Sequence, residues 1–341
     1  MSKTKKIVLI VIATILVVLL GAAAYAYNLI GSTKDSELNT ENISVNENVE
    51  DSSVINIAIF GVDGRVGVEG NRSDVIMIAS LDTTKNTVKL TSVMRDTFCE
   101  GDTSDGTTFQ KINAAYAFGG AELAVKTINQ NFDMNISDYV TISFESMISI
   151  VDALGGVDVD IANDTVLAYL NNAIASSNST YGRSDAQIDS TGVHTLNGGQ
   201  ALSYARIRYS DSDYQRTERQ REIVQAIFNK ARTSDAVSVA DAIAQIFPYM
   251  KTSMSVSKII GYAKLVMVSP DLSFSDFRVP TDEYSVSGYI DGVWYLFPNT
   301  LVDNARALHQ YIYGDDVNYE PSETVQSISD QITNYANTRT E

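Results

Sequence analysis

A long uncharged apolar segment near the N-terminus constrains this chain more than any other feature. It begins at Ile7 as IVLIVIATILVVLL and continues as GAAAYAY to Tyr27. About twenty apolar residues in a helix are enough to cross a hydrocarbon core of roughly 30 Å. We therefore expect residues 7–27 to form a transmembrane helix.

The charges around this segment predict its orientation. Residues 1–6 contain three lysines and no acid, so the positive-inside rule makes them a cytoplasmic tail and puts the rest of the chain outside the cell. A cleaved signal peptide is the alternative, because Ala24-Tyr25-Ala26 has the A-x-A form of a cleavage site. The apolar segment exceeds the usual signal-peptide core of about 7 to 15 residues, which favours an uncleaved, single-pass anchor in the cell membrane.

Composition argues against several classes of function. The chain of 341 residues has 42 acidic and 25 basic residues, a formal net charge of −17, and this argues against nucleic acid as a partner because phosphate neutralisation needs a basic face. The single cysteine, Cys99, is expected to be inert; it allows no intrachain disulfide and no cysteine-built zinc site, and it suits a Gram-positive bacterium that makes few disulfides. The two histidines, His194 and His309, leave little room for histidine-based metal sites or triads.

The remaining chain divides into three parts. Residues 28–52 are polar and acidic without apolar periodicity and are expected to be a flexible extracytoplasmic stalk. From residue 53 to 314, apolar runs of strand length alternate with segments of helical spacing and show no repeat period, which predicts one α/β domain. Residues 315–341 are expected to be a polar C-terminal tail.

Within the domain the patterns locate individual elements. The expected strands are the apolar run after residue 53, 75–81, 87–94, 139–144, 157–161, FSDFRVP and YIDGVWYLF. The expected helices are 111–130, ESMISIVDALGG, LNGGQALSYAR, DYQRTERQREIVQAIFNKAR, 236–249, 256–268 and NTLVDNARALHQYIYG. The polar segment that follows RDTF, and the Asn-, Ser- and Asp-rich segment 163–192, are interpreted as surface loops.

Arginines gather in one part of this acidic chain. Five lie within one short segment: Arg206, Arg208, Arg216, Arg219 and Arg221. A solvated helix face with i,i+4 ion pairs is the simple reading. Acids are few nearby, however, and arginine favours bidentate binding of phosphate or carboxylate. Because Arg216 and Gln220 share one helical face, the segment predicts an anionic ligand.

Polar clusters also stand at the ends of three expected strands: Gly61-Val62-Asp63-Gly64-Arg65, Arg72-Ser73-Asp74 and Arg95-Asp96-Thr97. Open α/β sheets bind ligands at strand ends, although Asp63 and Asp74 could each be a turn or cap residue. Two carboxylates without histidine or thiolate suit a hard cation such as Mg²⁺. Acids, arginines and Mg²⁺ together are typical of phosphoryl transfer, and the chain has no P-loop or GxGxxG motif to indicate a nucleotide.

At these residues the sequence resembles the LytR-CpsA-Psr family of bacterial cell-wall enzymes. Seven motifs occur in the family's order over roughly 54–232: GVDGR, RSDVIMI, SVMRDT, KINAAYAFGG, VDALGGVDVDI, LNGGQALSYARIR and QRTERQ. The resemblance implies a single α/β/α three-layer domain with a central mixed sheet behind the transmembrane helix. It also implies a phosphotransferase that moves a glycopolymer, such as teichoic acid or capsular polysaccharide, from undecaprenyl pyrophosphate to peptidoglycan at the membrane.

The same resemblance implies roles for individual residues. Asp63 and Asp74 would hold Mg²⁺, or Mn²⁺, at the pyrophosphate. Arg95 and Asp96 would be catalytic, with Asp96 either the general base or the residue that orients Arg95. The phosphate-binding residues would be Arg65, Arg72, Arg206, Arg208, Arg216, Arg219 and Gln220. A deep apolar cavity would take the polyprenyl chain, with segment 163–192 as an insertion at its entrance.

Three other functions are weighed against transfer. A transcriptional regulator, the label that the family historically carried, would need a basic recognition helix in the cytoplasm, where only about six residues are expected. A wall-binding module without catalysis would not need Arg95 together with both aspartates. A pyrophosphatase that hydrolyses the lipid carrier would use the same phosphate-binding residues, so the sequence does not separate it from a transferase.

Overall fold

A computed structural model of the chain describes most of the residues after position 52. The described residues are 38, 42–46, 53–63, 72–207, 213–234, 250–255, 258–259, 261–262, 273–315 and 318–339. The predicted transmembrane helix at 7–27, Arg65 and Arg208 lie outside this set. Among the helices of these ranges, none is both long and apolar enough to cross a membrane.

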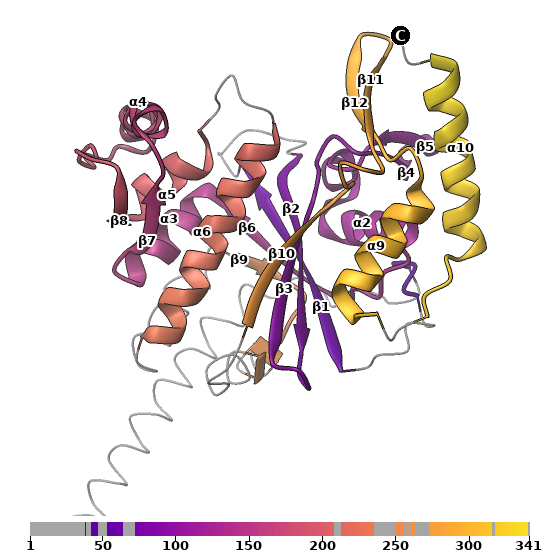
Figure 1. Ribbon diagram of the computed structural model, residues 1–341, viewed down its shortest axis with the longest axis horizontal. Helices are drawn as coiled ribbons and strands as arrows, with labels where there is room; N and C mark the ends of the chain where they lie inside the picture. The colour runs from indigo at the N-terminus through magenta and orange to yellow at the C-terminus, as the bar shows by residue number, and fades with distance from the viewer. Residues whose placement is uncertain are drawn as a thin grey trace, which may run out of the picture.

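A six-stranded mixed sheet lies at the centre, in the order β10-β3-β2-β1-β6-β9 (Figure 1). Its strands are β1 Val54–Val62, β2 Ser73–Asp82, β3 Thr87–Val93, β6 Asp138–Ser143, β9 Met250–Thr252 and β10 Ser273–Val279. β1 is parallel to β6 and β3 is parallel to β10, while β2 is antiparallel to both β1 and β3. The carboxyl ends of β1, β3, β6 and β10 therefore meet at one edge of the sheet, where β2 begins.

Helices cover both faces of this sheet (Figure 1). On one side lie α2 Ala114–Phe132, α9 Leu301–Tyr313 and α10 Glu323–Arg339. On the other side lie α3 Phe144–Ala153, α4 Asp164–Tyr181, α5 Gly198–Ala205 and α6 Asp213–Thr233, with the small sheet of β7 Val157–Ile161 and β8 Gly192–Leu196. The mixed α/β fold with a central mixed sheet agrees with the prediction.

Each helical layer has its own apolar core. The alternation of buried and half-buried residues along β1 puts Ala58 and Phe60 in the core shared with α2, α9 and α10. A second cluster, which includes Val151 and Tyr204, joins α3, α4, α5 and α6 to the β7–β8 pair. Burial of such side chains contributes about 1.5–3 kcal/mol each, which holds both layers in place around the sheet edge.

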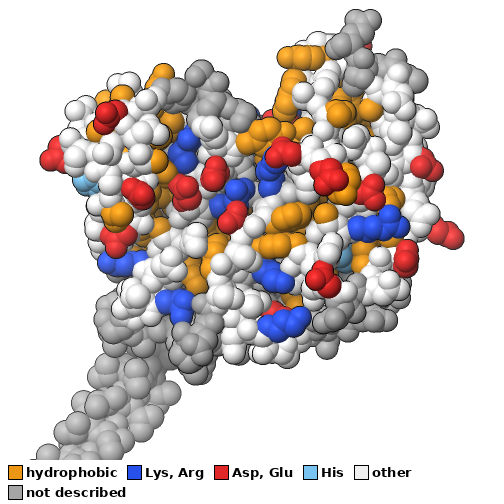
Figure 2. Space-filling model, in the orientation of Figure 1, with side chains coloured by type: hydrophobic (Ala, Val, Ile, Leu, Met, Phe, Trp, Pro, Cys, Tyr) orange, Lys and Arg blue, Asp and Glu red, His pale blue; other side chains and the backbone are white. Residues whose placement is uncertain are grey.

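Two hairpins complete the described fold. β4 Phe98–Thr103 pairs with β5 Gly106–Lys111, and β11 Val286–Ile290 pairs with β12 Val293–Phe297. The first hairpin corrects the prediction of a loop after RDTF. Phe98 and Cys99 are buried in the core, whereas the first half of β5 is exposed and the second half only partly buried, so the apolar signal of the pair was weak. On the face shown in Figure 2 the outline is notched beside the β11–β12 hairpin, and basic side chains lie among acidic ones without forming a continuous patch.

Segment 163–192 is not mainly a loop, because helix α4 occupies more than half of it. Asn163 begins the helix by accepting hydrogen bonds from the backbone N–H groups of Thr165 and Val166. Only a narrow stripe, centred on Leu170 and Ile174, is buried. An apolar face of this width is too small to dominate an Asn- and Ser-rich composition, and the loop prediction was wrong for this reason.

The predicted limits of the domain are also corrected at both ends. Helix α10 forms within the expected polar tail 315–341 and buries Val325, Ile328 and Ile332 in the core beside α2 and α9. Within the expected stalk 28–52, Ile43 is fully buried in the same core. Helix α10 carries one apolar stripe among polar residues, and this stripe contributes to the core because α2 and α9 lie against it.

Candidate functional site

A cavity of about 420 Å³ lies where β1 ends and β2 begins, between the sheet and helices α3, α5 and α6. Most of its wall is apolar. The apolar residues that line it are Ile59, Val75, Met77, Ile142, Phe144, Met147, Ile150, Leu202, Ala205, Ile223, Val224 and Ile227. The cavity therefore offers an oily interior that is suited to a hydrocarbon chain.

Five predicted site residues line this cavity. Asp63 and Asp74 come from the sheet edge, Arg206 from the end of α5, and Arg216 and Gln220 from α6. Arg206 and Arg216 bring two guanidinium groups to the cavity that also contains the two carboxylates. The wall thus combines an apolar interior with a set of groups able to bind phosphate and a hard cation.

The sequence around α5 explains why Arg206 is presented here. Asn197 and Gln200 form a reciprocal capping box: the Asn197 side chain accepts from the Gln200 backbone N–H at 3.0 Å, and Gln200 accepts from the Asn197 backbone N–H at 2.9 Å. Every residue of α5 is buried, so neighbouring elements enclose the helix on all sides. Arg206 follows its last turn as the C-cap residue and is exposed at the cavity.

A chain of ion pairs continues from Asp74 along the sheet edge. Arg95, two residues after the end of β3, donates from Nη1 to Asp74 Oδ1 at 2.8 Å and from Nε to Asp96 Oδ2 at 3.2 Å. Lys111, at the end of β5, lies with its Nζ 2.7 Å from Asp96 Oδ1. Arg95 is therefore held beside the cavity through Asp74, although it is not itself a wall residue.

Two aromatic residues position the Arg206 guanidinium. Its central carbon lies 4.8 Å from the centroid of the Phe144 ring, in cation–π geometry, and Nη1 donates to the Tyr181 hydroxyl at 3.4 Å. Phe144 is the first residue of α3 and Tyr181 the last of α4. Contacts with α3 and α4 thus position the Arg206 guanidinium without a ligand.

The other predicted residues lie elsewhere. Arg219 is buried and donates from Nη2 to the Ile207 carbonyl oxygen at 3.0 Å, so it supports the chain after α5 rather than facing the cavity. Arg72 is exposed just before β2 and is not a wall residue. Asp96 contacts Arg95 Nε and is not a wall residue. Arg65 and Arg208 remain predictions, because they fall outside the described residues.

The donor groups of this cavity fit a hard cation. In the described ranges no cluster of three or more His, Cys, Asp or Glu side chains could hold a metal ion. The cavity nevertheless contains two carboxylates, Asp63 and Asp74. Mg²⁺ commonly takes one or two carboxylates together with substrate phosphates and water, so this pair suits a cation that arrives with a phosphate ligand.

Cys99 and the two histidines do not contribute to the cavity wall. Cys99 is fully buried, and this burial raises the pKa of its thiol, which fits the expectation that it is inert. His194 lies in β8 with Nε2 3.3 Å from the Ser190 hydroxyl. His309 is buried in α9, where Nε2 donates to the Phe132 carbonyl oxygen at 2.9 Å.

Sequence reasoning did not single out Lys111, Phe144 or Tyr181. Lys111 stands in the quoted motif KINAAYAFGG, directly before a helix, and could have been marked as a cation without a nearby acid. Phe144 and Tyr181 carried no such signal, since their contact with Arg206 depends on the way that α3, α4 and α5 pack together.

Known proteins resemble this chain in sequence. The profile of the LytR_cpsA_psr family matches residues 20–308. A protein of Bacillus cereus named polyisoprenyl-teichoic acid–peptidoglycan teichoic acid transferase TagU is 31% identical over 304 residues, which cover 86% of this chain and 92% of the relative.

Solved structures share the fold. One, described as TagT bound to LIIa-WTA, has a TM-score of 0.65 and 25% identity over 82% of this chain and the whole of its own. Another, described as LytR-CPS2A-psr family protein YwtF (TagT) with bound octaprenyl pyrophosphate lipid, has a TM-score of 0.62 at 23% identity over the same shares.

Proposed function

The chain belongs to the LytR_cpsA_psr family, and from this premise we propose that it is a membrane-anchored, extracytoplasmic phosphotransferase. Its donor is a glycopolymer on undecaprenyl pyrophosphate, of the teichoic acid or capsular type, and its acceptor is peptidoglycan. The name of the Bacillus cereus relative supports a transferase with a polyisoprenyl-linked teichoic acid as donor and peptidoglycan as acceptor. Residues 7–27 anchor the enzyme in the cell membrane of a Gram-positive bacterium.

One observation carries this proposal: the apolar cavity and the phosphate-binding groups belong to the same wall. A prenyl chain needs an oily interior, and a pyrophosphate needs guanidinium groups. Arg206, Arg216 and Gln220 stand beside Leu202 and Ile223 in this wall. A lipid-linked pyrophosphate satisfies both halves of the cavity, whereas a free sugar phosphate would leave the apolar half unused.

The chemistry follows from the charges that the chain supplies. The acceptor hydroxyl oxygen bonds to the phosphorus that carries the glycopolymer, and its proton passes to solvent. The bond from this phosphorus to the bridging oxygen breaks, and polyprenyl phosphate leaves with the electron pair. Arg206 and Arg216 bind the pyrophosphate oxygens on which negative charge develops, and Arg95 approaches them from the sheet edge.

Asp63 and Asp74 are the residues that would hold Mg²⁺ or Mn²⁺ in this proposal. When bound, the cation neutralises pyrophosphate charge. Asp74 also accepts a hydrogen bond from Arg95, so it connects the proposed cation position to the catalytic arginine. Chelation with EDTA should therefore abolish transfer, and added Mg²⁺ should restore it.

The test uses the full-length protein in detergent with Mg²⁺, an undecaprenyl-pyrophosphate oligosaccharide and peptidoglycan fragments. We expect a joined product together with released lipid phosphate. Lipid phosphate without a joined product would instead make the protein a pyrophosphatase, since water would then be the acceptor.

Single substitutions test the site within the same assay. Asp74→Ala and Arg95→Ala should each reduce transfer about a hundredfold or more while thermal unfolding shows a folded protein. Arg306→Ala is the matched control, because this arginine pairs with Asp303 on the exposed surface of α9. Wild-type transfer by either site variant would refute the assignment of the site.

A further inference from the structure

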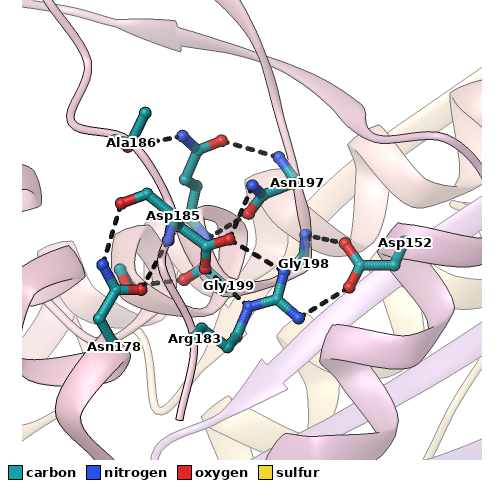
Figure 3. A network of polar contacts seen from close by, with 10 residues as sticks. Asp152, Asn178, Arg183, Asp185, Ala186, Asn197, Gly198 and Gly199 are labelled. Atoms are coloured by element: carbon teal, nitrogen blue, oxygen red, sulfur yellow. Dashed lines mark hydrogen bonds and ion pairs between the residues drawn. The ribbon is translucent and has the colours of Figure 1, made fainter. Parts of the chain in front are cut away.

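A network of polar contacts lies at the ends of α3 and α5 remote from Arg206 (Figure 3). Its central residue is Arg183, just after α4. Arg183 makes a bidentate pair with Asp185, through Nε at 2.7 Å and Nη2 at 3.0 Å, and donates from Nη1 to Asp152 Oδ2 at 2.9 Å. Asp152 stands in the last turn of α3, so Arg183 connects the chain after α4 to that helix.

The same network reaches the first turn of α5. Asp152 Oδ1 accepts from the Gly198 backbone N–H at 2.7 Å, and Asp185 Oδ1 accepts from Asn197 Nδ2 at 3.0 Å. Asp152 and Asp185 therefore each bond both to Arg183 and to the N-terminus of α5 (Figure 3). The contacts are directional and charge-assisted, which makes them among the stronger polar contacts available to a partly exposed site.

Two glycines permit this close approach. A Cβ atom on Gly198 would collide with the Ile148 carbonyl oxygen of α3, and one on Gly199 would collide with the Asp185 carboxylate. The first turn of α5 thus lies directly against the backbone of α3 and against the Arg183–Asp185 pair. The contact with the α3 backbone requires Gly198, and a side chain at position 199 would displace the Asp185 carboxylate.

The opposite ends of the same two helices hold Arg206. Asp152 is one end of α3 and Phe144 the other, and α5 runs from Gly198 to the C-cap Arg206. Each pair is separated by about 12 Å of helix axis. Because Asp152 contacts Gly198 and Phe144 contacts Arg206, the two helices are antiparallel and joined at both ends.

The turn that carries Arg183 also reaches Arg206 directly. Gly182 ends α4 in the left-handed conformation, with φ of 63°, and reverses the chain between Tyr181 and Arg183. Tyr181 accepts the hydrogen bond from Arg206, while Arg183 makes the network contacts. The turn at residues 181–183 therefore contacts the Arg206 guanidinium through Tyr181 and, through Arg183, the network at the N-terminus of α5.

We propose that Arg183 is a positioning residue for the phosphate site: it fixes the N-terminus of α5 against α3 and thereby sets where Arg206 stands in the cavity. This inference rests on the proposed function, in which Arg206 binds pyrophosphate. It assigns to the Asn- and Ser-rich segment around α4 the role of aligning a phosphate ligand.

A double-mutant cycle separates this role from a general effect on stability. The probe is geranylgeranyl pyrophosphate, titrated by calorimetry into full-length protein in lipid nanodiscs with Mg²⁺. Arg206→Ala should weaken binding about tenfold or more, because a charge-assisted contact is lost. Arg183→Gln should weaken it about fivefold, and the double variant should bind no more weakly than Arg206→Ala alone, since Arg183 acts through Arg206.

Two further variants calibrate the cycle. Arg183→Lys retains the charge but not the bidentate fork, so it should recover part of the affinity. Arg306→Gln removes a surface arginine of α9 that is also ion-paired, and it should leave the affinity unchanged. If Arg183→Gln does not fold, as judged by circular dichroism, Asp152→Asn replaces it in the cycle with the same expected results.

The outcomes are distinguishable. Effects of Arg183→Gln and Arg206→Ala that multiply, or an unchanged affinity in Arg183→Gln with a lowered melting temperature, overturn the positioning role and leave the proposed function standing. Absence of binding by the wild-type protein overturns the proposed lipid pyrophosphate donor and this inference with it.

Discussion

At the residue scale, the contacts of Asp96 bear on which residue takes the acceptor proton. Both of its carboxylate oxygens face cations: Oδ1 is 2.7 Å from Lys111 Nζ, and Oδ2 is 3.2 Å from Arg95 Nε. A general base must offer an oxygen to the acceptor hydroxyl within hydrogen-bond reach. These contacts favour the second of the two roles predicted for Asp96, which is to orient Arg95.

Substitution of Asp96 can distinguish the two roles. Asp96→Asn retains an oxygen for Arg95, so we expect the transfer rate to fall less than about tenfold, whereas loss of a general base costs about 10²- to 10⁴-fold. Any fall of the transfer rate at acidic pH, the acidic limb of the pH–rate profile, should be the same in Asp96→Asn as in the wild type. Loss of that limb, with a rate below about one hundredth of wild type, would identify Asp96 as the base.

His309 makes a prediction about stability and pH. Burial lowers the pKa of its imidazole below the ordinary 6.5, so the unfolded chain binds a proton more readily than the folded one. Stability from this group is complete above about pH 6.5 and is lost as pH falls towards the lowered pKa, at up to about 1.4 kcal/mol per pH unit. Denaturant unfolding at pH values from 7.5 to 5.5 should show that the free energy of unfolding falls less steeply with decreasing pH in His309→Gln than in the wild type. Equal dependence on pH in the two proteins would refute the prediction.

The site residues differ in how far sequence could predict them. Asp63, Asp74, Arg206, Arg216 and Gln220 stand in recognisable motifs, and the structure brings all five to one cavity. The role of Arg219 could not be read from its place beside Gln220, because its hydrogen bond to the Ile207 carbonyl oxygen depends on the path of the chain after α5. Spacing along a helix predicts a shared face, but not what lies opposite that face.

At the element scale, predictions succeeded where the apolar pattern was strong. The runs that form β1, β2 and β3 were recognisable because these strands are central and largely buried. Helices α4 and α10 were missed since each buries only a few residues, and the expected strand YIDGVWYLF is a hairpin that turns at Asp291-Gly292. A weak stripe becomes a helix only when another element covers it, which is tertiary information.

Helix α10 provides the test at this scale. Ile328 is almost fully buried against the core, while its neighbour Ser327 is exposed. Ile328→Ala should lower the free energy of unfolding by about 2–4 kcal/mol, and Ser327→Ala should change it by less than about 0.5 kcal/mol. Equal, small effects in denaturant titrations would mean that residues 323–339 behave as the polar tail that composition predicts.

At the scale of the whole molecule, the candidate site uses one helical layer and one edge of the sheet. The cavity wall takes residues from α3, α5 and α6 and from strands β1, β2 and β6. The layer of α2, α9 and α10 contributes core packing instead. The α/β class was predictable from the alternation of strand-like and helix-like segments along the sequence. Which helical layer lines the cavity depends on the strand order, which no local pattern encodes.

The proposed anchor gives a prediction at the same scale. Tethering keeps the cavity close to a donor in the membrane and so raises its effective concentration. A variant without residues 1–27 should bind geranylgeranyl pyrophosphate in solution as the full chain does, but transfer from donor in vesicles should fall about a hundredfold. Equal initial rates on vesicles for the two forms would contradict the role of the anchor.

The position of β10 has a consequence for how the chain reaches its folded state. Strand β10 pairs with β3 in a register that joins Ser273 to Thr87, and Asn56 of β1 bonds to Tyr313 across 257 residues. Contacts so distant in sequence form slowly because a long loop must close first. Because the chain is synthesised from its N-terminus, β3 keeps an unpaired edge until β10 emerges, so protection of that edge during synthesis would determine the yield of folded protein.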